Sequence, residues 1–118
     1  MGCNNCEIEM ITNDEIIQQE QRIINKWVSL KSSAFTRNKE FNLTLISIKN
    51  LLSAKRCYYT DKPLDHMNIS IDRIDNDKGY IKGNVCACDA NVNRIKDSLS
   101  IQDIEKILKK MKSLDNLK

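Results

Sequence analysis

The stretch that decides the fold reads NISIDRIDNDKGYIKGNVCACDANVNRIK and spans residues 68–96. Its first six residues, 68–73, alternate polar and apolar side chains, which is the pattern of a strand with one buried face. Turn-forming residues follow at 76–79 and again at 83–84. A short β-prone segment, residues 85–86, comes directly after the second turn. The sequence therefore predicts a two-stranded hairpin.

A helix is expected directly after this hairpin. Val92, Ile95 and Leu99 recur at helical spacing, so residues 89–98 are predicted to be helical. The predicted strand ends close to Asp72, and the predicted helix carries the amide of Asn93. A strand–loop–strand–helix unit can bring two such oxygens together on one ion. Mg²⁺ and similar hard cations bind few protein oxygens and keep waters or phosphate as their other ligands, so the sequence predicts a site for one divalent metal.

The rest of the chain is predicted to add helices to this unit. A capping pattern at residues 12–15 starts a long amphipathic helix over residues 13–35. Thr44 is expected to cap a second helix, and Ser100 with Asp103 a final one. Residues 57–60 are β-prone and precede a turn signal. These elements predict an α+β fold.

Size and composition point to one domain. The chain has 118 residues, of which 41% are hydrophobic and 30% charged, with a formal net charge of +3. No apolar run approaches the roughly 18 residues that a membrane span needs, and the first residues do not have the pattern of a secretory signal. We therefore expect a protein of the cytoplasm with no membrane partner.

Basic residues gather in the predicted long helix and just after it. Residues 22–39 include no acid and hold Arg22, Lys26, Lys31, Arg37 and Lys39. Such a cluster fits a surface that faces nucleic-acid phosphates. A solvated helix face explains the same pattern equally well, so both interpretations stay open.

Residues 41–100 resemble a phage-type subgroup of the HNH nucleases, which belong to the His-Me finger superfamily. The resemblance depends on the order and spacing of several short motifs: residues 41–44, 57–60 with 63–64, 70–75, 78–80, 83–85, 93–96 and 99–100. It implies a ββα-metal module over residues 57–100. An N-terminal helical segment, residues 1–56, and a C-terminal helix, residues 101–118, would flank that module within one compact domain.

The resemblance also implies roles for particular residues. Asp72 and Asn93 would bind one Mg²⁺ or Mn²⁺ ion. Asn84 would brace the loop and orient the general base, while Lys96, with Arg94 beside it, would lie near the substrate. The implied activity is hydrolysis of phosphodiester bonds in DNA. One site cuts one strand, so a nickase is expected, or a homodimer where both strands are cut.

One position departs from the family pattern, because Arg73 stands where the family places a histidine that acts as the general base. An arginine stays protonated and cannot take a proton from water. In a first hypothesis His66, the one histidine of the chain, is the base. In a second, the metal alone or Asp75 assists deprotonation while Arg73 neutralises developing phosphate charge. In a third, catalysis has been lost and the protein binds nucleic acid or inhibits a host protein.

The chain has five cysteines, and the family often holds zinc with two Cys-x-x-Cys pairs. Here the first internal pair is reduced to Cys57 with Thr60, and the second to Cys86 with Asp89 or to Cys88 out of register. An intact Cys-x-x-Cys pair at the N-terminus could complete a structural zinc site made of Cys3, Cys6, Cys57 and Cys86. Alternatively, the N-terminus is frayed and the inner cysteines are small buried thiols.

Overall fold

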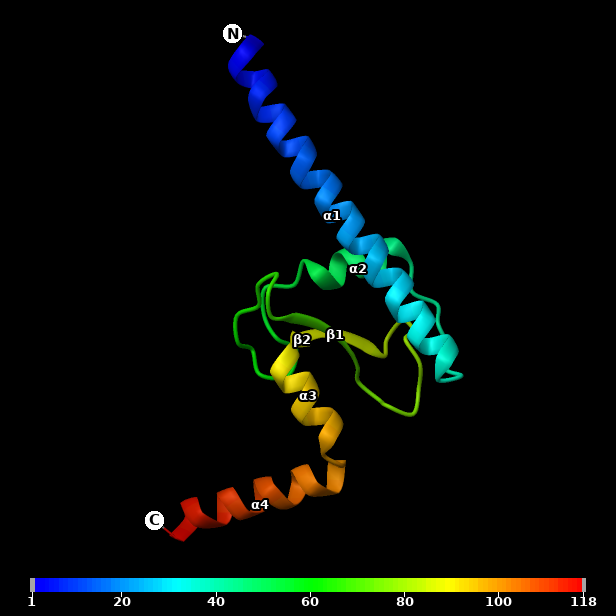
Figure 1. The fold of residues 1–118 in the computed structure, drawn as a ribbon. Helices are drawn as coiled ribbons and strands as arrows, with labels where there is room; N and C mark the ends of the chain where they lie inside the picture. The colour runs from blue at the N-terminus through cyan, green and yellow to red at the C-terminus, as the bar shows by residue number, and fades with distance from the viewer. Residues whose placement is uncertain (1, 118) are drawn as a thin grey trace.

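The structure is a computed structural model that describes the chain trace over residues 2–117 and the side chains over residues 13–114. Within these residues the fold is α+β, as predicted, with four helices and one antiparallel sheet of two strands (Figure 1). The elements in chain order are α1 (Gly2–Thr36), α2 (Leu45–Leu52), β1 (Ile69–Arg73), β2 (Val85–Asp89), α3 (Ala90–Ser98) and α4 (Ile101–Leu117).

The hairpin of β1 and β2 lies between two helices. The strands pair antiparallel, with Asp72 opposite Cys86. Because side chains alternate across a strand, Ile71 faces α2 and packs in a core with Ile48. Its neighbour on the other face, Ser70, contacts α3 through Asn93. The two helices therefore cover opposite faces of the sheet, as Figure 1 shows.

The main hydrophobic core joins α1 and α2 to the sheet. Its buried members are Leu30, Leu43, Ile48 and Ile71. Trp27 of α1 packs against this core and donates a 2.8 Å hydrogen bond from its indole nitrogen to the carbonyl of Leu43. This bond satisfies the polar end of the indole and fixes the segment after α1 against the helix.

The predicted helices are present, with one changed boundary. The helix predicted at residues 13–35 is confirmed, but it begins at Gly2, so the predicted cap at residues 12–15 is wrong. Thr44 caps α2 as predicted, because its hydroxyl accepts a 3.1 Å hydrogen bond from the backbone of Ser47. Ser100 and Asp103 cap α4 in the same reciprocal way.

Residues 57–60, predicted as β-prone, form a turn instead of a strand. The backbone N–H of Asp61 donates to the carbonyl of Cys57 at 2.9 Å. Asp61 adopts a φ of 60°, a left-handed conformation that Asp tolerates better than most residues. The turn therefore runs from Cys57 to this left-handed residue.

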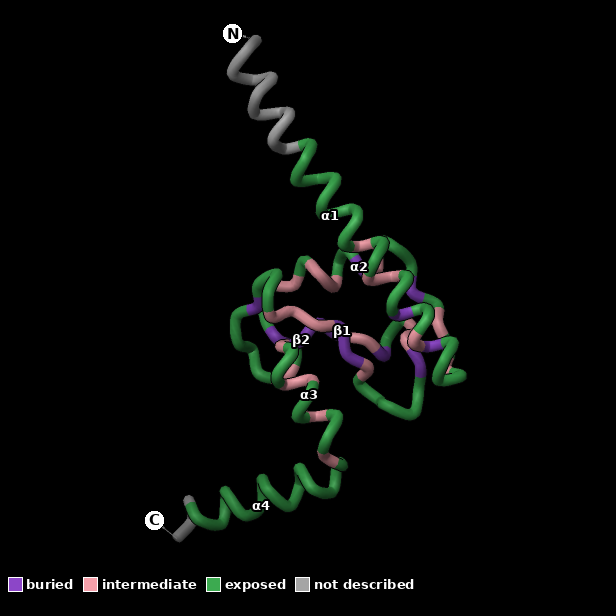
Figure 2. The backbone as a smooth tube through the Cα atoms, in the orientation of Figure 1, coloured by how far each residue is buried: buried purple, intermediate pink, exposed green. Residues whose placement is uncertain are grey.

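The α4 helix follows α3 and projects away from the sheet (Figure 1). Figure 2 shows that its described residues are exposed along the whole length. Among the described residues, no helix combines the length and the apolar character that a membrane span requires.

Gly79 allows the loop between the strands to lie against the segment after α1. The carbonyl of Glu40 accepts a 3.0 Å hydrogen bond from the N–H of Tyr80. A Cβ atom at Gly79 would lie 2.0 Å from that same carbonyl oxygen. Only a glycine fits such an approach of two backbones.

We therefore expect Gly79→Ala to lower the free energy of unfolding by about 3 kcal/mol, as overpacking against a rigid backbone does. Gly83 is the matched control, since it has open space around it but a φ of 89°. Gly83→Ala should cost only about 1 kcal/mol, the strain of a left-handed residue. Urea unfolding followed by Trp27 fluorescence measures both values. Equal losses would show that steric contact at Gly79 is unimportant.

Candidate functional site

The candidate site is centred on Asp72, a carboxylate near the end of β1 that is only 4% exposed. One of its oxygens, Oδ2, accepts a 2.7 Å hydrogen bond from the phenol of Tyr59. The same oxygen lies 3.1 Å from the ammonium nitrogen of Lys96. No hydrogen bond from the described residues reaches the other oxygen, Oδ1. The carboxylate is thus held by one oxygen and free at the other.

Asn93 lies on the first half of α3 and faces the same side of the sheet. Its amide nitrogen donates a 3.1 Å hydrogen bond to the hydroxyl of Ser70. Its amide oxygen, Oδ1, is buried and has no hydrogen-bond partner among the described residues. A buried polar atom without a partner costs about 1–3 kcal/mol, so this oxygen marks a place where a ligand is expected.

Strand geometry brings these two groups together. Ser70 and Asp72 lie two positions apart on β1, about 7 Å along the strand, and point to the same face. Asn93 contacts Ser70, while Lys96 contacts Asp72 from the next turn of α3. Asp72 and Asn93 therefore both lie between β1 and α3, and their joint binding of one ion stays a prediction.

The ammonium of Lys96 is surrounded by oxygens. Besides Asp72, it donates to the carbonyl of Arg73 at 3.0 Å and to the side chain of Asn76 at 3.4 Å. It also lies 5.7 Å from the ring centre of Tyr59. These contacts hold the Lys96 side chain in place within the protein, and its positive charge balances the negative charge of the buried Asp72.

Tyr59 is the second group that holds the carboxylate. Its burial, and then its hydrogen bond to Asp72, raise the pKa of the phenol well above the ordinary value. The phenol consequently stays protonated and remains a hydrogen-bond donor. Tyr59 fixes the rotation of the Asp72 carboxyl group.

Asn84 closes the loop that connects the two strands. It is 7% exposed, and its oxygen accepts from the backbone N–H of Asp75 at 2.9 Å. Its nitrogen donates to the carbonyls of Asp75 and Gly79 at 3.1 and 2.9 Å. The structure thus gives Asn84 the bracing position that the resemblance implied. The orienting of a general base stays a prediction.

Arg73 is directed into this loop. Its guanidinium donates to the carbonyls of Asn76 and Lys78, both at 3.1 Å, and lies 5.4 Å from the ring centre of Tyr80. These contacts hold the loop in place. The role of Arg73 in neutralising phosphate charge stays a prediction.

The two residues predicted as general base, His66 and Asp75, make their hydrogen bonds away from Asp72 and Asn93 in the described structure. His66 precedes β1, whereas Asp72 is near the end of that strand, and the carbonyl of His66 is bound by Arg22 of α1 at 3.1 Å. The exposed Asp75 uses its carboxylate to accept the N–H of Asp77 at 2.9 Å. Within the described residues, no hydrogen bond joins either side chain to Asp72 or Asn93.

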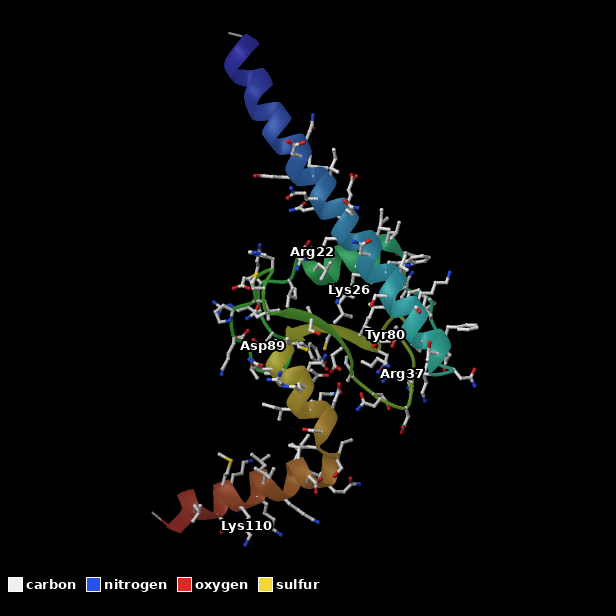
Figure 3. The ribbon with its side chains drawn as sticks, in the orientation of Figure 1. Arg22, Lys26, Arg37, Tyr80, Asp89 and Lys110 are labelled. Carbon is white, nitrogen blue, oxygen red and sulfur yellow. The ribbon has the colours of Figure 1, made fainter. Side chains whose placement is uncertain are left out.

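The basic residues of the long helix lie on the other side of the hairpin from α3. Figure 3 shows Arg22 and Lys26 on α1, which packs on α2. Lys31 stacks over the ring of Trp27 at 4.6 Å, and Arg37 is exposed near the C-terminal end of the helix. The structure therefore brings Lys96 to the candidate site and does not bring these four residues there. Arg94 lies on α3, where it donates to Asn91 at 2.6 Å.

The cysteines of the hairpin region are buried free thiols. Cys57, Cys86 and Cys88 are all in this class. The predicted zinc ligands Cys3 and Cys6 lie outside the residues whose side chains are described. Within the described part, no group of three or more histidine, cysteine, aspartate or glutamate side chains is placed to hold a metal. The structural zinc site stays a prediction. Asp89, which stands where the second cysteine of the inner pair would be, caps α3 instead by accepting hydrogen bonds from the N–H groups of Asn91 and Val92.

Cys57 differs from the other two thiols in its surroundings. Burial raises the pKa of Cys57, but hydrogen bonds from the Thr60 hydroxyl and from backbone N–H groups lower it more, so the net shift is downward. One of these donors is the N–H of Asp89, 3.4 Å from the sulfur. Burial instead raises the pKa of Cys86, and that of Cys88 rises from 9.0 to about 12.

The raised pKa of Cys88 predicts that the protein loses stability at alkaline pH. The folded protein holds the Cys88 proton more tightly than the unfolded chain does, so the contribution is complete below about pH 9 and is lost as the pH rises toward 12. At pH 10.5 the loss should be about 2 kcal/mol relative to pH 7.5. Urea unfolding in reductant at both pH values measures it. Cys88→Ala should show a correspondingly smaller pH dependence, and an unchanged one would contradict the assignment.

Sequence reasoning missed two residues of the site. Tyr59 binds Asp72, and Ser70 binds Asn93. The two-residue period of a strand could have found Ser70, because it places Ser70 and Asp72 on one face. Tyr59 gave no such signal, since its position depends on how the turn at residues 57–61 lies on the hairpin.

Comparison with known proteins finds two similar viral proteins. An "uncharacterized 29.0 kDa protein in dda-modA intergenic region" of Enterobacteria phage T4 is 33% identical over 98 residues, which are 80% of this chain and 38% of the phage protein. "Uncharacterized protein R423" of Acanthamoeba polyphaga mimivirus is 32% identical over 78 residues, which are 66% of this chain and 14% of that protein. The chain thus spans well under half the length of both relatives. No family model matches it, and no solved structure does.

Proposed function

We propose that this protein is a metal-dependent endonuclease of the HNH class, with a ββα-metal core, that hydrolyses phosphodiester bonds in DNA. The observation that carries the proposal is the pair of available oxygens between β1 and α3. One is Oδ1 of Asp72, which no described hydrogen bond reaches, and the other is the buried, partnerless Oδ1 of Asn93.

The donor set fits a hard divalent cation. A carboxylate and an amide oxygen are the ligands that Mg²⁺ or Mn²⁺ accept, and two protein ligands leave positions for water and phosphate. Such an ion would polarise a phosphoryl oxygen and stabilise the departing one. Asp72 and Asn93 would hold it, and the contacts of Tyr59 and Lys96 fix Asp72 so that its free oxygen has one direction.

Lys96 contributes in a second way. Its ammonium lies beside the carboxylate and carries a charge opposite to that of a phosphate. Because Asp72 and Lys96 neutralise one another, a cation at Asp72 and Asn93 would give the site a net positive charge. That charge attracts a phosphodiester and fits the sequence-based expectation that Lys96 lies near the substrate.

One observation favours a second candidate function. Arg73 takes the place of the usual general base, and its guanidinium is engaged in the loop by two carbonyls. A protein with this fold that binds nucleic acid or inhibits a host protein without hydrolysis would need no base there. The two candidates differ in one measurable property, turnover.

Supercoiled plasmid incubated with the protein and Mg²⁺ or Mn²⁺ tests the proposal. We expect conversion to the nicked form, and none after addition of EDTA. Linear product at high protein concentration would indicate paired sites acting on both strands. Absence of any nicking with either metal, together with binding of the plasmid, would overturn hydrolysis and support the second candidate.

A further inference from the structure

The apolar side of α4 is uncovered and borders the proposed nuclease site, because Tyr59 and Lys96 also line the hollow beside α4. Six apolar side chains line the helix and are 41% to 72% exposed: Ile101, Ile104, Ile107, Leu108, Met111 and Leu114. A helix of 17 residues has little stability in water unless its apolar side is packed. This stripe therefore indicates that α4 has a partner in solution.

The spacing of the stripe is the same in both chain directions. From residue 101 to residue 114 the apolar positions are separated by steps of 3, 3, 1, 3 and 3. The centre of the pattern lies between Ile107 and Leu108. Two copies of such a helix can pack antiparallel about a two-fold axis with every apolar position opposite another one.

The charges beside the stripe select the antiparallel orientation. Asp103 and Lys110 are seven residues apart on one flank, and Glu105 and Lys112 are seven apart on the other. An antiparallel pair brings Asp103 of one copy to Lys110 of the second, and Glu105 to Lys112. A parallel pair would place acid beside acid and lysine beside lysine, which is unfavourable. In the described chain, none of these four residues forms an ion pair.

We propose that the α4 helices of two copies of this chain pack antiparallel and form a homodimer. The second copy's α4 would enter a hollow of about 500 Å³ between α3 and α4. Ile95 of α3 and Leu99, the residue that follows α3, form one wall of that hollow together with Tyr59 and Lys96, and the stripe of α4 forms the other. Each copy thus contributes two helices to a four-helix interface, and each fills the hollow of its partner.

The available area fits a dimer of moderate affinity. Burial of an aliphatic side chain removes about 100 Å² of apolar surface, so a half-exposed stripe and the facing wall of α3 supply about 400 Å² per copy. With the polar rim, the total approaches the roughly 1,200 Å² at the lower end of stable interfaces. A concentration-dependent dimer with Kd in the micromolar range is expected.

Sedimentation equilibrium of the full chain between about 1 and 200 µM tests the proposal. We expect a mass that rises from one copy to two. Ile107→Lys should raise Kd by more than about a hundredfold, since the two-fold axis places two lysines at the centre of the interface. Phe35→Lys is the matched control, because Phe35 is 87% exposed on α1 and outside the interface, and it should leave Kd unchanged.

Charge exchange tests the orientation. Glu105→Lys and Lys112→Glu should each raise Kd by roughly tenfold, because each change disrupts two rim ion pairs. The double variant restores both pairs and should return Kd to the original value. A monomer at all concentrations would overturn the proposal. So would a dimer lost in Phe35→Lys and kept in Ile107→Lys, or a double variant weaker than both single ones.

Discussion

Asp72→Asn should abolish nicking of supercoiled plasmid. The variant keeps the shape of the side chain and an oxygen to accept the hydrogen bond from Tyr59, but it removes the charge that a cation requires. A metal ion contributes about 4 kcal/mol or more to transition-state stabilisation, so the nicking rate should fall at least roughly a thousandfold. The measurement is the initial rate of nicking in Mn²⁺, with circular dichroism to show that the variant is folded.

Asp77 supplies the matched control for this variant. It is an exposed aspartate in the loop between the strands, and no hydrogen bond from the described residues reaches its carboxylate. Asp77→Asn makes the same chemical change and should nick at close to the original rate. Asp72→Asn should also lose some stability, because Lys96 keeps its charge at a part-buried position. Equal nicking by the two variants would remove Asp72 from the site.

A related comparison tests whether His66 is the general base. His66 lies before β1, on the side where Arg22 of α1 binds its carbonyl. We therefore expect His66→Ala to nick within about twofold of the original rate, where loss of a true base costs 10²-fold or more. A hundredfold loss in His66→Ala, with Mn²⁺ affinity unchanged, would restore the first hypothesis.

The sequence predicted those parts of the fold that local patterns specify. The alternation of residues 68–73 identified β1, and the hydroxyl of Thr44 identified the start of α2. One prediction was wrong, because α1 begins ten residues before its predicted cap. The β-prone residues 57–60 form a turn that leads into the left-handed conformation of Asp61, which no local pattern specified.

The site was predictable to the extent that strand and helix periodicity place side chains. Asp72 and Asn93 are on one side of the sheet because of those periods. The hydrogen-bond partners of Asp72 could not be predicted in this way, since Tyr59 contacts it from a turn that no local pattern specified. Lys96 was expected to face substrate, and only the packing of α3 on β1 shows it bound to Asp72.

Asn93→Leu should change stability and metal binding in opposite directions. In the metal-free protein, the leucine removes a buried oxygen that has no partner and loses one hydrogen bond to Ser70. The first change relieves about 1–3 kcal/mol and the second costs about 1 kcal/mol, so the free energy of unfolding in EDTA should rise by up to about 2 kcal/mol. An apolar side chain cannot bind a cation, so Kd for Mn²⁺ should rise at least about a hundredfold.

The same variant separates a binding residue from a packing residue. A ligand present at a hundred times its Kd stabilises a folded protein by about 2.7 kcal/mol, so Mn²⁺ should raise the melting temperature of the original protein and have little effect on Asn93→Leu. Asn93→His, which keeps a metal-binding atom on the same turn of α3, should recover most of the Mn²⁺-dependent rise. A leucine variant that is less stable in EDTA and still gains stability from Mn²⁺ would show that Asn93 only packs against the sheet. The opposed signs arise because an oxygen kept without a partner weakens the metal-free fold, and binding a cation is what would compensate for that loss.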